Sequence, residues 1–110
     1  MEFIIPHQDF LKTEFKQAVI QYYQKHPEDI VFKSVGSDTM KGGRFGLLKS
    51  QGINDLFDIL AETPVTELDI SYNSISSFEI AEIEALMNGL NRQGIKKLNI
   101  AFQWIFNLEN

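Results

Sequence analysis

Two serines and three glutamates stand close together in the second half of the chain, and these residue types could carry nucleophilic, phosphate-accepting or acid–base chemistry. Nucleophilic catalysis needs a general base beside the hydroxyl, and no histidine lies near Ser76 or Ser77 in the sequence. Ser76 and Glu79 instead have the S-x-x-E spacing of a helix capping box, and Glu79, Glu82 and Glu84 would complement the dipole at a helix start. We therefore expect structural roles for Ser76 and Glu79, and no catalytic residue.

A glycine-rich, basic stretch occupies residues 36–46 and invites comparison with phosphate-binding loops. It lacks the Lys-Ser/Thr ending of a Walker loop and the spacing of a dinucleotide fingerprint, while residues 43–46 form a G-x-x-G as in KH domains. Lys41 and Arg44 would supply positive charge to a nucleotide or an RNA. The simpler interpretation is a soluble insertion between two elements, so nucleotide or RNA binding is the third of our functional hypotheses.

The side chains that could bind a metal ion are few and scattered. His7 and His26 lie at opposite ends of one predicted helix, too far apart to share a metal ion. The chain has no cysteine, which excludes thiolate ligands and disulfides. We expect no metal site and no cofactor.

Length and charge narrow the class of protein further. A chain of 110 residues suits one domain, 1–110. Residues 1–50 carry seven Lys/Arg against six Asp/Glu, whereas residues 51–110 carry three against nine, which disfavours nucleic acid and favours a basic protein partner. The start of the chain has no secretory pattern, and no stretch approaches the roughly 18 apolar residues of a membrane span. We expect a cytoplasmic protein with no membrane partner.

Hydrophobic periodicity predicts the elements that must position these residues, in the order helix, strand, helix, strand, helix, strand. The first helix has one apolar stripe, formed by Leu11, Phe15, Ala18, Val19 and Tyr22. Proline or glycine follows each helix and ends it. The predicted elements, in chain order, are 11–25, 30–35, 50–62, 65–70, 77–93 and 98–101.

The second and third helix–strand units echo one another at one constant offset, which places residue 68 on residue 98. The register holds through helix, turn and strand without a gap, across two kinds of periodicity. The aligned pairs are Ile53 with Ile83, Leu56 with Leu86, Leu60 with Leu90, Val65 with Ile95, Leu68 with Leu98, Ile70 with Ile100, Tyr72 with Phe102, and Ile75 with Ile105.

The strand part of this repeat resembles the leucine-rich repeat, whose signature is L-x-x-L-x-L-x-x-N-x-L. Val65, Leu68, Ile70, Asn73 and Ile75 occupy its marked positions, and the helix and period resemble the ribonuclease-inhibitor-like subtype. The resemblance implies an α/β solenoid, with a curved parallel sheet and helices on its convex side. It also implies that Asn73 replaces lost backbone partners where the chain leaves the strand.

The resemblance divides the chain unevenly. Residues 1–27 would form an N-terminal capping helix, 28–64 an irregular first repeat with the glycine-rich insertion, 65–94 a second repeat and 95–110 a partial third. The alternating pattern of the first strand aligns Ile30 with Leu68 and Phe32 with Ile70. The first and second strands are therefore separated by more residues than one repeat period. Gln103 stands where the family has asparagine.

Two surfaces follow from this arrangement as expected contacts for a partner. Strand residues between the marked positions would face the concave side, and the C-terminal edge, which also carries Trp104, would be an uncovered strand edge. We expect a homodimer through that edge, or a longer array of which this chain is a fragment. The expected partner-binding residues are Glu67, Asp69, Ser71, Tyr72, Lys97, Asn99, Phe102 and Trp104.

Three functions are therefore in competition. The first is a non-enzymatic protein–protein interaction module, such as an inhibitor, adaptor or effector, that uses the concave face or the C-terminal edge. The second follows from a similarity of residues 44–101 to the STAS domains of anti-anti-sigma factors, in which phosphorylation of Ser76 or Ser77 would control partner binding. The Asp-Ser-Ser-Gly form of that motif is missing here. Nucleotide or RNA binding by residues 36–46 is the third.

Overall fold

Helices and strands alternate along the chain in the computed structural model, which describes residues 1–36, 45–73, 75 and 78–100. This order agrees with the prediction from hydrophobic periodicity. Short helical turns, Gln8–Phe10, Leu11–Phe15 and Phe45–Leu47, accompany the main elements. The main elements are α1 (Lys16–Lys25), β1 (Val31–Lys33), α2 (Ser50–Leu60), β2 (Glu67–Asp69), α3 (Ile80–Gln93) and β3 (Lys97–Asn99).

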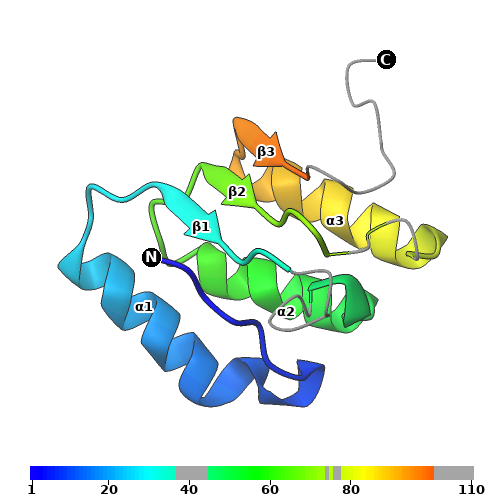
Figure 1. Ribbon diagram of the computed structural model, residues 1–110, viewed down its shortest axis with the longest axis horizontal. Helices are drawn as coiled ribbons and strands as arrows, with labels where there is room; N and C mark the ends of the chain where they lie inside the picture. The colour runs from blue at the N-terminus through cyan, green and yellow to red at the C-terminus, as the bar shows by residue number, and fades with distance from the viewer. Residues whose placement is uncertain (37–44, 74, 76–77, 101–110) are drawn as a thin grey trace.

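The three strands form a small open parallel sheet in the order β1-β2-β3, and α2 and α3 lie along one of its faces (Figure 1). Leu68 pairs with Leu98, so the predicted register of the last two strands is confirmed. The predicted alignment of Phe32 with Ile70 is wrong, because Phe32 pairs with Leu68. A slip of two residues leaves every side chain on the same face, so the hydrophobic pattern alone could not exclude it.

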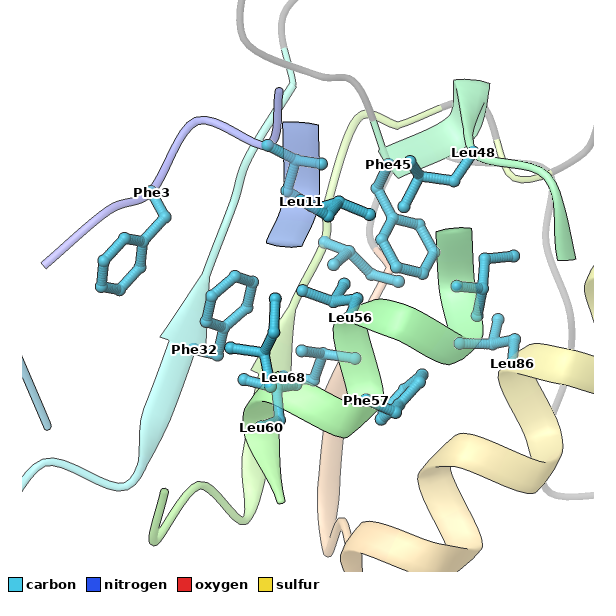
Figure 2. Close-up of a cluster of buried hydrophobic side chains, with 14 of the residues drawn as sticks. Phe3, Leu11, Phe32, Phe45, Leu48, Leu56, Phe57, Leu60, Leu68 and Leu86 are labelled. Carbon is cyan, nitrogen blue, oxygen red and sulfur yellow. The ribbon is translucent and has the colours of Figure 1, made fainter. Parts of the chain in front are cut away.

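The core lies between the sheet and the two helices beneath it (Figure 2). Phe32 and Leu68 point inward from β1 and β2, and their neighbours along each strand are more exposed. The helix α2 buries a complete stripe beneath them, and each such side chain stabilises the fold by roughly 1.5–3 kcal/mol. The stripe consists of Ile53, Leu56, Phe57 and Leu60, all with no exposed surface.

The two sheet-covering helices approach closely at one glycine. An ideal Cβ built on Gly89 of α3 would lie 2.1 Å from Cδ2 of Phe57 on α2. A side chain at residue 89 would therefore force the ring aside or part the helices.

The start of α3 differs from the prediction. Glu79 is its N-cap, and the capping box joins Glu79 to Glu82, whose carboxylate accepts from the Glu79 N–H at 3.3 Å. The capping box predicted for Ser76 with Glu79 is therefore wrong by one helical turn. In a capping box the acidic residue at the third helical position accepts a hydrogen bond from the N–H of the N-cap. Glu82 holds this position, which the prediction had given to Glu79. At the other end Gly94 is the expected left-handed cap, with φ of 71°.

The N-terminal segment covers the outer edge of β1. The Phe3 N–H donates to the Lys33 carbonyl at 2.7 Å, and the Phe3 ring stacks on Phe32 at 5.2 Å between centroids. The predicted first helix is interrupted, since Thr13 has non-helical backbone angles and α1 begins three residues later. Its buried side also differs from the predicted stripe, because Tyr23 is buried and Ala18 is exposed.

Candidate functional site

Asn73 holds together the turn that follows β2. Its side chain is 1% exposed, and its amide nitrogen lies 2.8 Å from the carbonyl oxygen of Ser34 and 2.9 Å from that of Ile70. Its amide oxygen accepts from the Phe45 N–H at 3.1 Å. Asn73 thus joins the ends of two strands to the segment before α2, which is a structural and not a catalytic use of the amide.

The residue before it, Tyr72, has a left-handed backbone with φ of 62°. This conformation is uncommon for a residue with a side chain, and it turns the chain sharply enough to bury Asn73 while Tyr72 stays exposed. Phe102, the predicted neighbour of Tyr72, lies outside the described residues, as do Trp104, Ser76, Lys41 and Arg44.

Charged side chains of both signs alternate between neighbouring strands of the sheet. Glu67 pairs in register with Lys97, and Lys33 with Asp69, so opposite charges are cross-strand neighbours. Asn99 is exposed at the end of β3. These side chains therefore form a polar and internally compensated surface, which suits solvent at least as well as a partner.

Ser71 was expected to contact a partner, but its side chain is buried in the turn after β2. It is 4% exposed, and its hydroxyl donates to the Asp69 carboxylate at 2.6 Å. Its own carbonyl accepts from the Gly36 N–H at 2.8 Å. Ser71 closes the turn between β2 and Asn73, and it leaves Asp69 with one oxygen already bonded.

An apolar groove lies at the opposite side of the fold from the N-terminal segment, between α3 and β3. Among the described residues every side chain that lines it is apolar, and Met87 is 47% exposed. The lining residues are Ile75, Ile83, Leu86, Met87, Leu90, Leu98 and Ile100.

The strand beside this groove, β3, is at the edge of the sheet that the described residues form. The Asn99 carbonyl accepts from the Ile70 N–H at 2.9 Å, so the backbone of Asn99 faces β2. In a parallel strand, residues that bond to one neighbour alternate with residues that face the other side. The backbone groups of Leu98 and Ile100 therefore face away from the described sheet, beside the apolar groove.

The sequence assigned the groove side chains to the core and singled out the strand face instead. The missed signal is the echo itself. Phe57 of α2 aligns with Met87 at the offset of the echo; α3 covers Phe57, whereas none of the described elements covers Met87.

The charged clusters outside these surfaces join structural elements. Asp29 accepts from the Tyr22 hydroxyl at 2.6 Å and from the Val31 N–H at 3.0 Å, which ties α1 to β1. Burial acts to raise the pKa of Asp29, but these hydrogen bonds outweigh burial, and its pKa lies below the usual value. The pKa of Tyr22 is raised, first because its hydroxyl donates to Asp29.

A second cluster attaches the N-terminal segment to α2. Lys12 lies 3.1 Å from the buried Asp55 carboxylate, which also accepts from the Gln51 side chain at 2.9 Å. The Gln8 side chain accepts from the Lys49 N–H at 2.9 Å, at the N-cap of α2. The polar side chains of this cluster thus have partners within the protein, and their arrangement does not require a ligand.

Across the described part of the chain, no three His, Cys, Asp or Glu side chains gather as a metal site would need. His7 pairs with Asp9, and His26 with Glu28. None of the helices described here is long and apolar enough to cross a bilayer.

Comparisons with protein-family models, with curated proteins and with solved structures find no match to this chain.

Proposed function

We propose that this chain is a non-enzymatic protein–protein interaction module that engages its partner at the C-terminal edge, through the α3–β3 groove and the outer side of β3. The observation that carries the proposal is the groove itself. Seven apolar side chains from a helix, a strand and a turn converge beside strand backbone that faces away from the described sheet. Met87 is exposed, and four of the other side chains are half-buried, and apolar surface that stays in contact with water can mark an interaction site.

The chemistry of the edge favours one kind of ligand. An extended peptide laid along β3 would form main-chain hydrogen bonds with Leu98 and Ile100, and its alternate side chains would enter the groove. The main-chain bonds supply affinity, and the shape of the groove selects the side chains. The acidic second half of the chain adds a preference for a basic partner.

The proposed architecture is a short solenoid of the leucine-rich-repeat type, used as an inhibitor, adaptor or effector-like unit. Its support is the register that pairs Leu68 of β2 with Leu98 of β3, together with the Asn73 turn. In stacked repeats each unit covers the apolar side of the one before it, and within the described part of the chain no unit covers the apolar side of α3 and β3.

A pair of variants on α3 tests the proposal. Met87→Lys places a charge in the groove, and Ile80→Lys places the same charge at a residue that is 75% exposed and does not line the groove. Both variants should fold, because both sites are exposed and the lysine stem can lie along apolar surface. Wild-type and variant chains then serve as bait in affinity capture, and each captured protein is purified and titrated directly.

A protein that binds the wild type and Ile80→Lys with equal affinity, and Met87→Lys about tenfold or more weakly, supports the proposal, since a desolvated charge at an interface costs over roughly 1.4 kcal/mol. A partner that binds all three chains equally contradicts the proposed surface.

A further inference from the structure

The two edges of the sheet differ, and the difference limits how copies of this chain can join. At the β1 edge, Glu2 forms a bridge with Lys33, and the Phe3 N–H donates to the Lys33 carbonyl at 2.7 Å. At the other edge, the sheet that the described residues form ends at β3. Strand backbone that faces away from its sheet is a template for pairing with another chain. A head-to-tail array would need both edges, and it is blocked at β1.

Two copies that meet at their β3 edges must run antiparallel, because a twofold axis turns identical edges in opposite directions. The backbone groups of Leu98 face away from the described sheet, so in an antiparallel pair centred on Leu98 the two copies of this residue can exchange hydrogen bonds. Leu98 is half-buried and lines the α3–β3 groove. Pairing centred on this residue would therefore bring the grooves of the two copies side by side.

Exposed charges beside the groove are separated by sign along its length. Glu84 lies in the first half of α3, and Lys96 lies between the end of α3 and the start of β3. Because α3 returns antiparallel to the parallel strands β2 and β3, the two side chains lie toward opposite ends of the groove. Neither has an ion-pair partner among the described residues, whereas Arg92 in the last turn of α3 pairs with Asp58 at 3.1 Å. An antiparallel pair would bring Lys96 of each copy toward Glu84 of the other.

Met87 supplies apolar surface at the middle of this arrangement. It is 47% exposed, it lines the groove, and it follows Glu84 by three residues, so the two side chains are neighbours on one exposed side of α3. The side of α3 that carries Gly89 is buried against Phe57 of α2. The exposed side is thus the one that a second copy can cover, and removing its apolar surface from water favours association.

We infer that the partner of the α3–β3 edge is a second copy of this chain, and that the two copies pair their β3 strands antiparallel about a twofold axis. The inference rests on the proposed function, because it names the partner of the same site. Met87 of each copy lies near the axis, and Lys96 of each copy faces Glu84 of the other. Since the N-terminal segment covers the β1 edge of both copies, assembly stops at a dimer.

The net charge of the chain, −5, opposes self-association only weakly at physiological salt. At roughly 0.15 M salt the screening length is about 8 Å, so distant charges contribute little. The pairs of opposite sign that face one another across the axis contribute more, and the twofold symmetry makes each pair occur twice.

Light scattering at protein concentrations from about 10 µM to about 1 mM provides the first test. The wild type should change from monomer to dimer within this range. Met87→Lys should dimerise about tenfold or more weakly, because two added charges would meet near the axis. Gln24→Lys, at an exposed residue of α1, is the matched control and should dimerise as the wild type does. A wild type that stays monomeric throughout, or a dimer that Met87→Lys does not weaken, would overturn the inference.

A charge exchange between two variants tests the antiparallel arrangement. Lys96→Glu and Glu84→Lys should each dimerise about tenfold more weakly than the wild type, since each change places two like-charged pairs across the axis. An equimolar mixture should form a heterodimer about as tightly as the wild type dimerises, because both contacts then join opposite charges. Fluorescence anisotropy of one labelled variant, titrated with the other, measures this affinity. A mixture that associates no more tightly than the separate variants would contradict the arrangement.

Lys25→Glu and Glu2→Lys form the control pair, with the same net charges at exposed residues outside α3 and β3. Each of these variants should dimerise as the wild type does, and so should their mixture. If the control pair also associated only when mixed, net charge and not the groove would account for the result, and the inference would fail.

Failure of the inference and failure of the proposed function give different results. A monomeric wild type, together with a captured protein that binds Ile80→Lys but not Met87→Lys, would retain the groove as a binding site and reject the second copy. A dimer that neither Met87→Lys nor the charge exchange affects would reject the α3–β3 edge as the site of association.

Discussion

The unit made of α2 and β2 and the unit made of α3 and β3 have nearly the same pattern of apolar residues and different surroundings. Leu68 and Ile70 are at most 1% exposed, while their partners Leu98 and Ile100 are half-buried. The difference comes from position and not from composition, since within the described residues the first unit lies between two neighbours and the second has one. The comparison shows that a repeated pattern specifies a structural unit, whereas its neighbours decide whether the pattern becomes core or binding surface.

The largest expected effect comes from truncating equivalent side chains of the two units. Phe57→Ala should lower the free energy of unfolding by about 3–5 kcal/mol, because it removes a fully buried ring at the contact with Gly89. Met87→Ala should cost about 1 kcal/mol, since Met87 is 47% exposed. Urea denaturation of both variants measures the difference. Equal losses would show that α3 is packed as tightly in solution as α2.

A second prediction concerns the turn that joins the units. Asn73→Ala should lower the free energy of unfolding by about 3 kcal/mol, because it leaves buried carbonyls and the Phe45 N–H without their side-chain partner. Asn88→Ala is the matched control, at an exposed position of α3, and should cost less than about 0.5 kcal/mol. Thermal unfolding followed by circular dichroism compares the two. A small loss of stability in Asn73→Ala would show that the side-chain hydrogen bonds of Asn73 do not hold the turn together.

A third prediction compares two glycines in the two helices. Gly89→Ala should destabilise the fold by about 1–3 kcal/mol, since its Cβ would lie 2.1 Å from the Phe57 ring. Gly52→Ala should cost less, about 1 kcal/mol, because its Cβ would push aside the Gln8 side chain and its hydrogen bond from the Lys49 N–H, while alanine favours the helix. Urea denaturation measures both changes in the free energy of unfolding, from the midpoints of curves that have the same dependence on urea concentration. If Gly52→Ala were the costlier change, α2 and α3 would not pack as closely as described.

The sequence predicted the order of the elements and the pairing of β2 with β3, and the physical reason is redundancy. A single offset aligns helix and strand positions together, so a wrong register would conflict with both periods. The predicted register of β1 was wrong because β1 is one short strand without an aligned helix. Its alternating pattern determines which side chains share a face, and a shift by two residues leaves those faces unchanged. The cap of α3 was wrong because Ser76 and Glu79 can both start a capping box, and the pattern does not choose between them.

The candidate site was harder to predict, because exposure depends on what lies nearby in space. Ser71 alternates correctly for an exposed strand residue, but the turn buries it against Asp69. The groove residues read as core because they have the composition of core. The contact of Phe57 with Gly89, and the capping of α2 by Gln8, join segments that no local pattern connects.

The smallest effect concerns the edge of the sheet at β1, which the N-terminal segment covers, and it completes the contrast with the β3 edge, which none of the described segments covers. The pKa of Asp29 is depressed: burial opposes the shift, while the Tyr22 and Val31 hydrogen bonds, the N-terminal amino group and His26 produce it. A depressed carboxyl pKa contributes stability that is present above the unfolded value of about 4 and is lost as the pH falls through the folded value.

Asp29→Asn should therefore cost about 1 kcal/mol at pH 7, and the cost should vanish as the pH falls below about 4. Urea denaturation at a series of pH values measures this convergence. Asp9→Asn, at an exposed site beside His7, is the control and should show little change at any of these pH values. A penalty for Asp29→Asn that stayed constant into acid would mean that shape and not charge holds α1 against β1. The covered edge would then depend on packing alone.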